Sequence, residues 1–320
     1  MIKELKQKTW LPTVALMCVA AVWGSTFVVM QGAVARYPMF AFLSLRFALA
    51  AVTLAIAQPR AFKKFNKANL RLGIAASAFL AMGYILQTAS LLPADQGGTT
   101  PARSAFLTGM YVVMVPVLST AFRRKMPGRG IIIGVVLALA GLGALSGLSP
   151  SGGVTHWVRG DSLVLGGALG YSLHMLVLGR AGQDHDARAL SIIQMGMLAI
   201  ICGVISVATG EHASAPTNPQ VLVALLITSL FASTFAYTVQ TWAQLKLPPS
   251  RVALILVLEP AFGGIFGWAV AGHVIWREVI GAGLMLAGMI ISELLSARSA
   301  EAQGQQLEPA PEGIPVYAEE

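Results

Sequence analysis

The chain has 320 residues, of which 56% are hydrophobic and only 11% are charged, and its formal net charge at pH 7 is +8. Ordinary soluble domains are about one quarter charged, so this composition excludes a typical soluble protein and indicates a membrane protein. The basic residues lie in short clusters between apolar runs, a distribution that argues against nucleic-acid binding. Both cysteines lie inside apolar runs, which argues against a disulfide framework or a CxxC metal site.

The apolar runs predict ten membrane-spanning helices, because about 20 apolar residues cross a hydrocarbon core roughly 30 Å thick. Residues 1–10 resemble the start of a signal peptide, but the run that follows is long enough to span and nine more come after it. We therefore expect residues 1–10 to be a retained cytoplasmic N-terminus. The predicted spans cover residues 11–31, 39–57, 70–92, 101–121, 130–147, 161–179, 188–209, 219–245, 250–272 and 275–297.

The distribution of lysine and arginine predicts the orientation. With a cytoplasmic N-terminus, the inner segments hold 17 of these residues and the outer segments hold four, which favours both termini inside. Residues 298–320 are polar and lack apolar periodicity, so we expect a disordered cytoplasmic tail. The predicted location is a bacterial cytoplasmic membrane, crossed many times.

The second half of the chain repeats the first. A Tyr-x-x-Gln-Thr motif occurs at residues 84–88 and again at 237–241, and a G-x-x-L-x-L-A-G motif occurs at 134–141 and 281–288. Five spans are an odd number, so the second copy enters the membrane from the opposite side, as in many secondary transporters. The predicted fold class is an all-α membrane protein of two inverted five-helix repeats, residues 11–147 and 161–297, joined by an outer loop at 148–160.

Four short motifs resemble those of a known family. Trp-Gly-Ser-Thr-Phe occurs at residues 23–27, Leu-Arg-Phe at 45–47 and Leu-Glu-Pro at 258–260, beside the paired G-x-x-L-x-L-A-G sequences. Together, in this order and with ten spans, they resemble the EamA-type permeases of the drug/metabolite transporter superfamily. The resemblance covers about residues 10–295. One departure is Gly272-His273, where many members have Gly-Glu, with Glu278 nearer the last helix.

The resemblance implies a secondary active transporter that works by alternating access without ATP. Its expected partners are a small-molecule substrate (a metabolite, amino acid or drug-like solute), the lipid bilayer and a coupling proton or cation. We expect no cofactor, no nucleic acid, no catalytic residues and no metal site. The direction of export rests on the family resemblance, and the sequence does not give the oligomeric state.

Two charged residues lie deep inside predicted spans. Helical rise places Arg46 about 10 Å from the outer face and Glu259 about 14 Å from the inner face, which is nearly the same depth. Charges at the centre of a membrane are costly, so both should face the protein interior. Arg46 is a candidate for binding a substrate carboxylate, and Glu259 for binding a proton, a cation or a cationic substrate. Alternatively, they form a buried structural pair or bind backbone groups near Pro260.

Aromatic and polar side chains share this central layer. Trp23, Ser25, Tyr111 and Tyr171 fall near the middle of their spans, and rings with one polar tip suit a mostly apolar pocket. We predict that these four residues, with Arg46 and Glu259, bind substrate. Helix packing is the simpler account of each tyrosine alone.

His174 and Gln194 are weaker candidates for the pocket. Each is expected mainly to make hydrogen bonds between helices.

The repeated Tyr-x-x-Gln-Thr motif is a candidate gate. Helical rise places Tyr84 about 21 Å from the inner face and Tyr237 about 24 Å from the outer face, so the two copies should approach opposite faces and not share a pocket. We predict that Gln87 helps to close the outer vestibule and Gln240 the inner one. Repeated interhelical packing is the alternative account.

Other classes of protein remain open alternatives. A channel or a non-transporting membrane scaffold would have a similar composition. An intramembrane enzyme is less favoured, because the sequence contains no G-x-S-x-G or H-E-x-x-H motif. The absence of a Walker A sequence argues against a primary pump within this chain.

Overall fold

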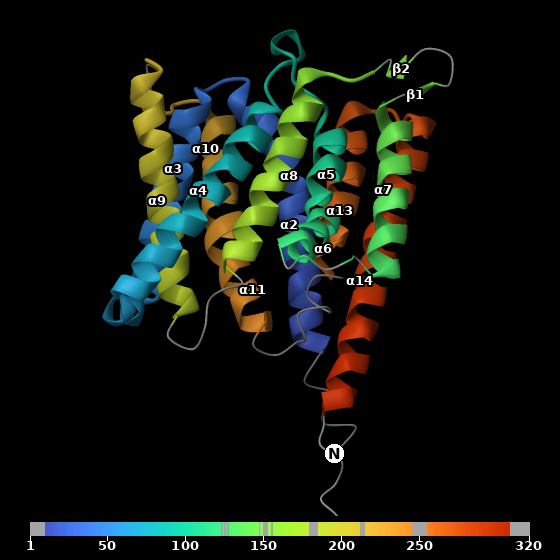
Figure 1. Ribbon diagram of the computed structural model, residues 1–320. Helices are drawn as coiled ribbons and strands as arrows, with labels where there is room; N and C mark the ends of the chain where they lie inside the picture. Colours follow the sequence, from blue (N-terminus) through green and yellow to red (C-terminus); the bar gives the residue numbers. More distant parts are fainter. Residues whose placement is uncertain are drawn as a thin grey trace, which may run out of the picture.

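A computed structural model describes residues 10–307 apart from 123, 125, 127, 147, 150–152, 155, 179–184, 212–214 and 245–254. The chain forms a bundle of helices that run roughly side by side (Figure 1). The first half contains α2 (Trp10–Val34), α3 (Met39–Ala57), η1 (Pro59–Lys64), α4 (Lys67–Ala89), η2 (Ala94–Gln96), α5 (Pro101–Gly109), α6 (Tyr111–Phe122) and α7 (Arg129–Ser146).

The second half follows a short hairpin of β1 (Leu148–Ser149) and antiparallel β2 (Gly153–Val154). It contains α8 (Arg159–Leu178), α9 (Ala187–Ala208), α10 (Pro219–Leu226), the π-helical segment η3 (Ile227–Phe235), α11 (Ala236–Gln244), α13 (Leu258–Ala271) and α14 (Trp276–Leu307).

Seven helical segments in the described part of the chain are long and apolar enough to cross a membrane. They correspond to the first four and the sixth to eighth predicted spans. The remaining predicted spans coincide with α7, α13 and α14. The helix α13 has 14 residues, and the start of the ninth predicted span falls within residues 245–254, outside the described residues. The number of ten spans therefore stays a prediction.

Two details differ from the sequence-based expectation. The hairpin of β1 and β2 lies in the predicted connecting loop, so the fold is helical with one small exception to the all-α class. The helix α14 continues to Leu307, so residues 298–307 are helical where we predicted disorder. Alanine, glutamate, glutamine and arginine dominate this stretch and favour helix, and the first proline comes only at Pro309. The predictions for residues 1–9 and 308–320 lie outside the described residues.

Local sequence signals start several helices. The side chains of Asn66, Thr100, Asp186 and Asn218 each accept a hydrogen bond from a backbone N–H in the first turn of the following helix. These residue types are preferred N-caps because they satisfy N–H groups that have no partner within the helix. The fourth predicted span is interrupted at Met110, between α5 and α6.

The two halves pack against each other in a symmetric pattern. The fifth helices, α7 and α14, pack along one another, and so do the second helices, α3 and α9. The third helix of the first half, α4, contacts α8 and α9, while its counterpart in the second half, η3 with α11, contacts α2 and α3. Each contact therefore has an equivalent when the two halves are exchanged, as expected for two related units.

Corresponding helices of the two halves run in opposite directions. The helix α2 ends where α5 and α8 begin, because the Gln31 side chain donates to the Thr99 carbonyl at 3.5 Å and the Gly160 amide donates to the Gly97 carbonyl at 2.8 Å. We call this end of the bundle the closed face; it is the upper end in Figure 1. The opposite end, where α8 ends and α9 begins, is called the open face.

At the closed face, α9 ends where α3 begins. The carboxylate of Glu211, just after α9, accepts hydrogen bonds from the Phe40 and Ala41 amides at 3.1 and 2.8 Å, and so caps α3. Burial and the nearby Glu211 carboxylate raise the pKa of Tyr37, which lies between α2 and α3.

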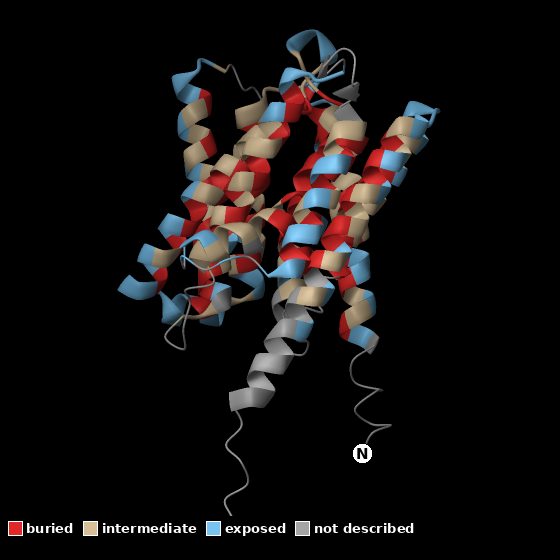
Figure 2. Cartoon of the chain, turned by 45° about the vertical axis from the view of Figure 1, so that its right-hand side comes forward, coloured by how far each residue is buried: buried red, intermediate tan, exposed pale blue. Residues whose placement is uncertain are grey.

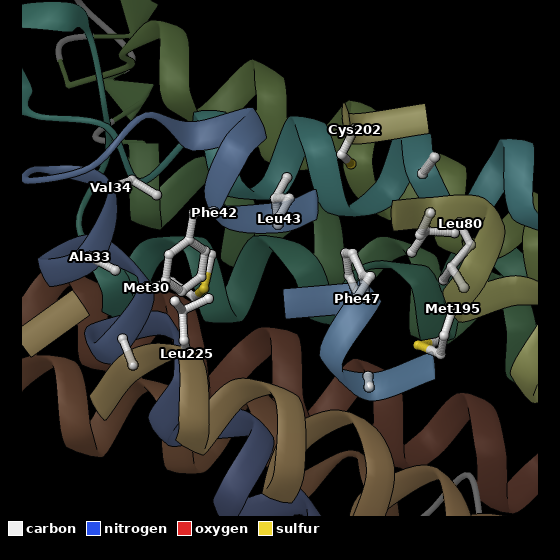
Figure 3. Packing of buried hydrophobic residues seen from close by; sticks show 14 of the residues in the cluster. Met30, Ala33, Val34, Phe42, Leu43, Phe47, Leu80, Met195, Cys202 and Leu225 are labelled. Carbon is white, nitrogen blue, oxygen red and sulfur yellow. The ribbon is translucent and has the colours of Figure 1, made fainter. Parts of the chain in front are cut away.

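Close helix contacts and a dispersed apolar core hold the bundle together. Buried residues lie between helices and exposed residues face outward (Figure 2). A large cluster around Phe42, Phe47 and Leu80 joins α2, α3, α4, α9 and α10 (Figure 3). A Cβ on Gly141 would lie 2.5 Å from the Gly281 carbonyl oxygen, so glycine allows α7 and α14 to approach backbone to backbone.

Candidate functional site

A cavity of about 480 Å³ lies inside the bundle, between the two halves. Its walls come from α2, α3, α4, α5, α6, α8, α9, α11 and α13. This volume lies in the range of small-molecule pockets. The residues that line it include most of those predicted from sequence, namely Trp23, Arg46, Tyr84, Gln87, Tyr111, Tyr171, Tyr237, Gln240 and Glu259.

Arg46 presents an unsatisfied positive charge at this cavity. It is 3% exposed, its guanidinium carbon lies 5.0 Å from the ring centroids of both Phe47 and Tyr84, and its Nη1 is 3.7 Å from the Met30 sulfur. Its Nε is buried and has no hydrogen-bond partner. Cation–π contacts stabilise a desolvated guanidinium by about 2 kcal/mol, which is less than a carboxylate partner provides.

Glu259 is the acidic group of the cavity. It lies in the first turn of α13, and within the described residues it makes no ion pair with Arg46 or any other residue. The prediction of a buried structural pair of Arg46 and Glu259 is therefore wrong for this conformation. The two side chains line one cavity while neither neutralises the other.

Small residues bring α13 and Glu259 to this place. A Cβ on Gly24 of α2 would lie 2.7 Å from the Gly263 amide nitrogen and 2.9 Å from the Glu259 carbonyl oxygen. A Cβ on Gly263 would lie 2.3 Å from the Cβ of Ala105 on α5. Only glycine permits this approach, so α2, α5 and α13 meet closely beside the cavity.

Tyrosines and a tryptophan form a connected aromatic group in the cavity wall. Tyr84 and Tyr171 lie edge to face with centroids 5.4 Å apart, Tyr171 contacts Tyr111 at 6.4 Å, and Trp23 contacts Tyr237 at 5.9 Å. Edge-to-face rings of this kind build a rigid apolar wall. The indole nitrogen of Trp23 donates to the Ala232 carbonyl in η3 at 2.7 Å, which fixes the ring against the π-helical segment.

The predicted separation of the two Tyr-x-x-Gln-Thr copies is wrong. The hydroxyl groups of Tyr84 and Tyr237 lie 3.3 Å apart, and Gln87 and Gln240 line the same cavity. The depth estimate counted only helical rise along ideal axes. It neglected the reach of two long side chains that point toward each other, and it neglected η3, whose π-helical turns advance the chain less per residue than an α-helix.

Gln87 lies at the closed-face end of the cavity. Its amide nitrogen donates to the Thr108 hydroxyl at 3.0 Å, and its carbonyl oxygen accepts from the Tyr171 hydroxyl at 2.9 Å. Three helices, α4, α5 and α8, are thereby joined above the pocket. Thr108 is a site residue that the sequence analysis missed, because a threonine in an apolar run carries no distinctive signal.

Ser25 does not line the cavity. Its hydroxyl donates to the Val22 carbonyl of its own helix at 2.7 Å. Successive residues of an α-helix are about 100° apart, so residues 23 and 25 cannot both face one cavity. The side chains that do so beside Trp23 are Thr26 and Phe27.

Toward the open face, the cavity reaches Leu178 at the end of α8 and His185 before α9. Here His174 Nε2 and Gln194 Oε1 lie 2.6 Å apart, which joins α8 to α9. The predicted interhelical role of His174 and Gln194 is thus confirmed. Both residues also line the cavity.

The closed face contains a charged cluster that the sequence analysis missed. Arg103, counted there as an outer basic residue, is 5% exposed and donates from Nε and Nη2 to Asp161 at 3.2 and 2.5 Å. Its Nη1 lies 3.9 Å from Glu278, which also accepts from the Trp268 indole at 3.3 Å. The sequence did contain a signal for this cluster: Arg103, Asp161 and Glu278 all lie near the ends of predicted spans at the same predicted face.

Among the described residues, no group of three or more His, Cys, Asp or Glu side chains could hold a metal ion. The fold and cavity define a multi-pass helical membrane protein with an internal pocket of small-molecule size. The model of the EamA-like transporter family matches residues 11–147 and 158–294. The chain therefore belongs to the EamA-like transporter family, as its motifs predicted, and is a membrane transporter.

Individual relatives agree with this family. The chain is 30% identical to an uncharacterized transporter of Archaeoglobus fulgidus over 285 residues, which cover 87% of this chain and 84% of the relative. A crystal structure with 16% sequence identity has a TM-score of 0.61 and covers 90% of this chain and 99% of its own. At that identity, the structural likeness shows the fold alone. The names of family and relative indicate a transporter and not an enzyme.

Proposed function

We propose that this protein is a secondary active transporter that exports a small organic solute by alternating access. In this proposal it crosses a bacterial cytoplasmic membrane ten times, with both termini in the cytoplasm and inverted repeats at residues 11–147 and 161–297. The open face is then cytoplasmic and the closed face is outside. The excess of basic residues in the predicted inner segments supports this orientation.

The observation that carries the proposal is that Arg46 and Glu259 line one cavity without pairing with each other. Arg46 has a buried nitrogen without a partner, and Glu259 makes no ion pair among the described residues. A buried unpaired charge is costly, so such a group is retained for a ligand. An anionic group of the solute binds Arg46, and Glu259 binds a cationic group of the solute or the coupling proton.

The aromatic wall defines the remainder of the solute. Aromatic rings and a few hydroxyl groups line the cavity that also holds Arg46 and Glu259; the rings are those of Trp23, Tyr84, Tyr111, Tyr171 and Tyr237. Such walls bind apolar or planar groups with few directional contacts. We expect a compact solute with one acidic group and an apolar body. Gln87 and Gln240 add amide groups to the lining of the same cavity.

Metabolite export from cells tests this proposal. The medium of cells that express the wild-type chain is compared by mass spectrometry with that of cells expressing Arg46→Gln, Glu259→Gln or Asp95→Asn, and of empty-vector cells. Asp95 is exposed at the closed face and serves as a matched control for loss of a carboxylate. We expect wild type and Asp95→Asn to enrich the same acidic metabolites, and Arg46→Gln to lose that enrichment.

The two mutants separate the roles of the charges. If Glu259→Gln loses the export that a proton gradient drives but still exchanges solute across the membrane without that gradient, the residue binds the proton. If it loses both, the residue binds solute. An Arg46→Gln profile equal to wild type would contradict the anion site. Identical profiles for wild type and empty vector in cells that contain the folded protein would contradict export.

A further inference from the structure

The charged cluster at the closed face links helices from both halves of the bundle. Arg103 lies in the first turn of α5, Asp161 in the first turn of α8, and Glu278 in the first turn of α14. Any motion that separates the halves at this face must therefore separate these charges. Arg103, Asp161 and Glu278 are not among the residues that line the solute cavity.

Asp161 is the centre of this cluster. It is fully buried, and its two carboxylate oxygens accept from the Thr99 hydroxyl at 2.6 Å, the Val158 amide at 3.1 Å and the Arg103 guanidinium. Arg103 also donates from Nη2 to the His156 carbonyl at 3.1 Å. Four donors satisfy this carboxylate. Separating it from them would therefore cost free energy unless water molecules replaced the lost hydrogen bonds.

Neighbouring backbone contacts seal the same face. The Thr99 amide donates to the Ser90 carbonyl at 2.7 Å, and the hydroxyl groups of Ser90 and Ser104 lie 3.1 Å apart. A Cβ on Gly160 would lie 2.6 Å from the Thr99 amide nitrogen, so the start of α8 presses directly against the loop before α5. The face is closed by tight backbone packing around a charged centre.

The other half of the repeat has no equivalent of these carboxylates. The family match begins at residue 11 in the first half and at 158 in the second, an offset of 147 residues. At this offset the counterparts of Asp161 and Glu278 are Val14 and Ile131. The counterpart of Arg103 falls within residues 245–254, outside the described residues. At these two positions the related helices therefore differ in chemistry.

We propose that Arg103, Asp161 and Glu278 form an ionic latch that holds the closed face shut, and that this latch sets the resting state of the transporter. The inverted halves alone would give two closed states of similar stability. The latch stabilises only one of them, so the empty protein rests with the closed face shut. This inference assumes the alternating access of the proposed function, but it does not depend on which solute is carried.

Cysteine accessibility tests the latch without any solute. Cys18 and Cys202 are first replaced by alanine, and one reporter cysteine is introduced at Thr88 or at Met175. Both positions line the cavity, Thr88 near the closed face and Met175 toward the open face. A membrane-impermeant maleimide is applied to right-side-out and inside-out vesicles, so that labelling from each side is measured separately.

We expect the Met175→Cys reporter to label from the open-face side and the Thr88→Cys reporter to resist labelling from the closed-face side. With Asp161→Asn, labelling of Thr88→Cys from the closed-face side should rise about tenfold or more, while labelling of Met175→Cys should fall. Opposite changes at the two reporters are the signature of a shifted equilibrium. Asp95→Asn should leave both unchanged.

Two results would overturn the latch. One is unchanged labelling of both reporters, which would mean that the cluster does not hold the face closed. The other is a rise at both reporters, which would mean that the cluster only braces the fold. If Asp161→Asn does not yield folded protein, Glu278→Gln decides. It removes the charge in the 3.9 Å contact with Arg103 and keeps an amide oxygen that can accept from Trp268. Labelling of Thr88→Cys should then rise and labelling of Met175→Cys should fall, each by a smaller factor than with Asp161→Asn.

Discussion

Two buried arginines, Arg103 at the closed face and Arg46 in the cavity, meet the cost of burying a charge in different ways. Arg103 contacts the carboxylates of Asp161 and Glu278, while Arg46 contacts the rings of Phe47 and Tyr84 and a sulfur atom. The charge of Arg103 is neutralised by carboxylates of the same chain, whereas Arg46 has no anionic partner among the described residues. The difference separates a charge that joins helices within the chain from one that is available to a ligand.

The largest expected effect is on stability at the closed face. Arg103→Gln leaves the buried Asp161 carboxylate without its cation, which should lower the free energy of unfolding by about 3–5 kcal/mol. Thermal unfolding of the detergent-solubilised protein measures the loss. Arg36→Gln is the control, because Arg36 is exposed and its guanidinium donates to the carbonyl of Gly32 in the preceding turn. Equal melting of the two variants would contradict the assignment of Arg103 to the fold.

The matching change in the cavity should act on binding. Arg46→Gln removes a charged hydrogen-bond donor, which should weaken solute binding by about 1.5–3 kcal/mol, or roughly 10- to 150-fold. Its stability without solute should stay the same or rise, because the unpaired buried charge is gone. Titration calorimetry with an exported solute measures the first effect and thermal unfolding the second. A loss of stability as large as that of Arg103→Gln would break the comparison.

Backbone packing provides a third contrast. Gly160→Ala places a methyl group 2.6 Å from the Thr99 amide nitrogen and should destabilise the closed face by about 1–3 kcal/mol. Gly196 of α9 has no atom within 4 Å of the equivalent position, so Gly196→Ala should be neutral or stabilise by up to about 1 kcal/mol. Differential scanning fluorimetry distinguishes the two signs. A neutral Gly160→Ala would show that the closed face is loosely packed.

The smallest expected effect concerns Tyr84 and Tyr237 in the cavity wall. Their hydroxyl groups are 3.3 Å apart, which is long for an O–H···O hydrogen bond, so each change to phenylalanine should cost less than about 1 kcal/mol. The double mutant should lose no more than the larger single mutant, because both remove the same contact. A double-mutant cycle of thermal stability measures this coupling. Additive losses would show that the two hydroxyl groups act independently.

Composition and repetition were sufficient to predict the helical membrane fold and the two related halves, and the resemblance of four short motifs was sufficient to predict the family. Residues such as Arg46 and Glu259 could also be selected, because a charge inside an apolar span is a strong signal. The relative positions of side chains were harder to predict. Helical rise gives depth along one axis, and the π-helical segment η3 and the long side chains of Tyr84 and Tyr237 changed which residues meet.

The sequence could not reveal how the charges divide between fold and ligand. Arg103 resembled an ordinary outer basic residue, and its role depends on Asp161 and Glu278, which are 58 and 175 positions away in the chain. Ser25 was selected by depth alone, although its rotation about the helix axis excludes it from the cavity. Burial and rotation are set by packing between the halves, and periodicity within one span does not determine them.

Flux in proteoliposomes tests the central claim most directly. The purified chain is reconstituted with a solute identified by export from cells, and flux is measured with and without a solute or proton gradient. We predict saturable, gradient-dependent flux that Arg46→Gln abolishes and Asp95→Asn retains. Unsaturated flux at channel rates, or flux equal in wild type and Arg46→Gln, would contradict a transporter that binds its solute at Arg46.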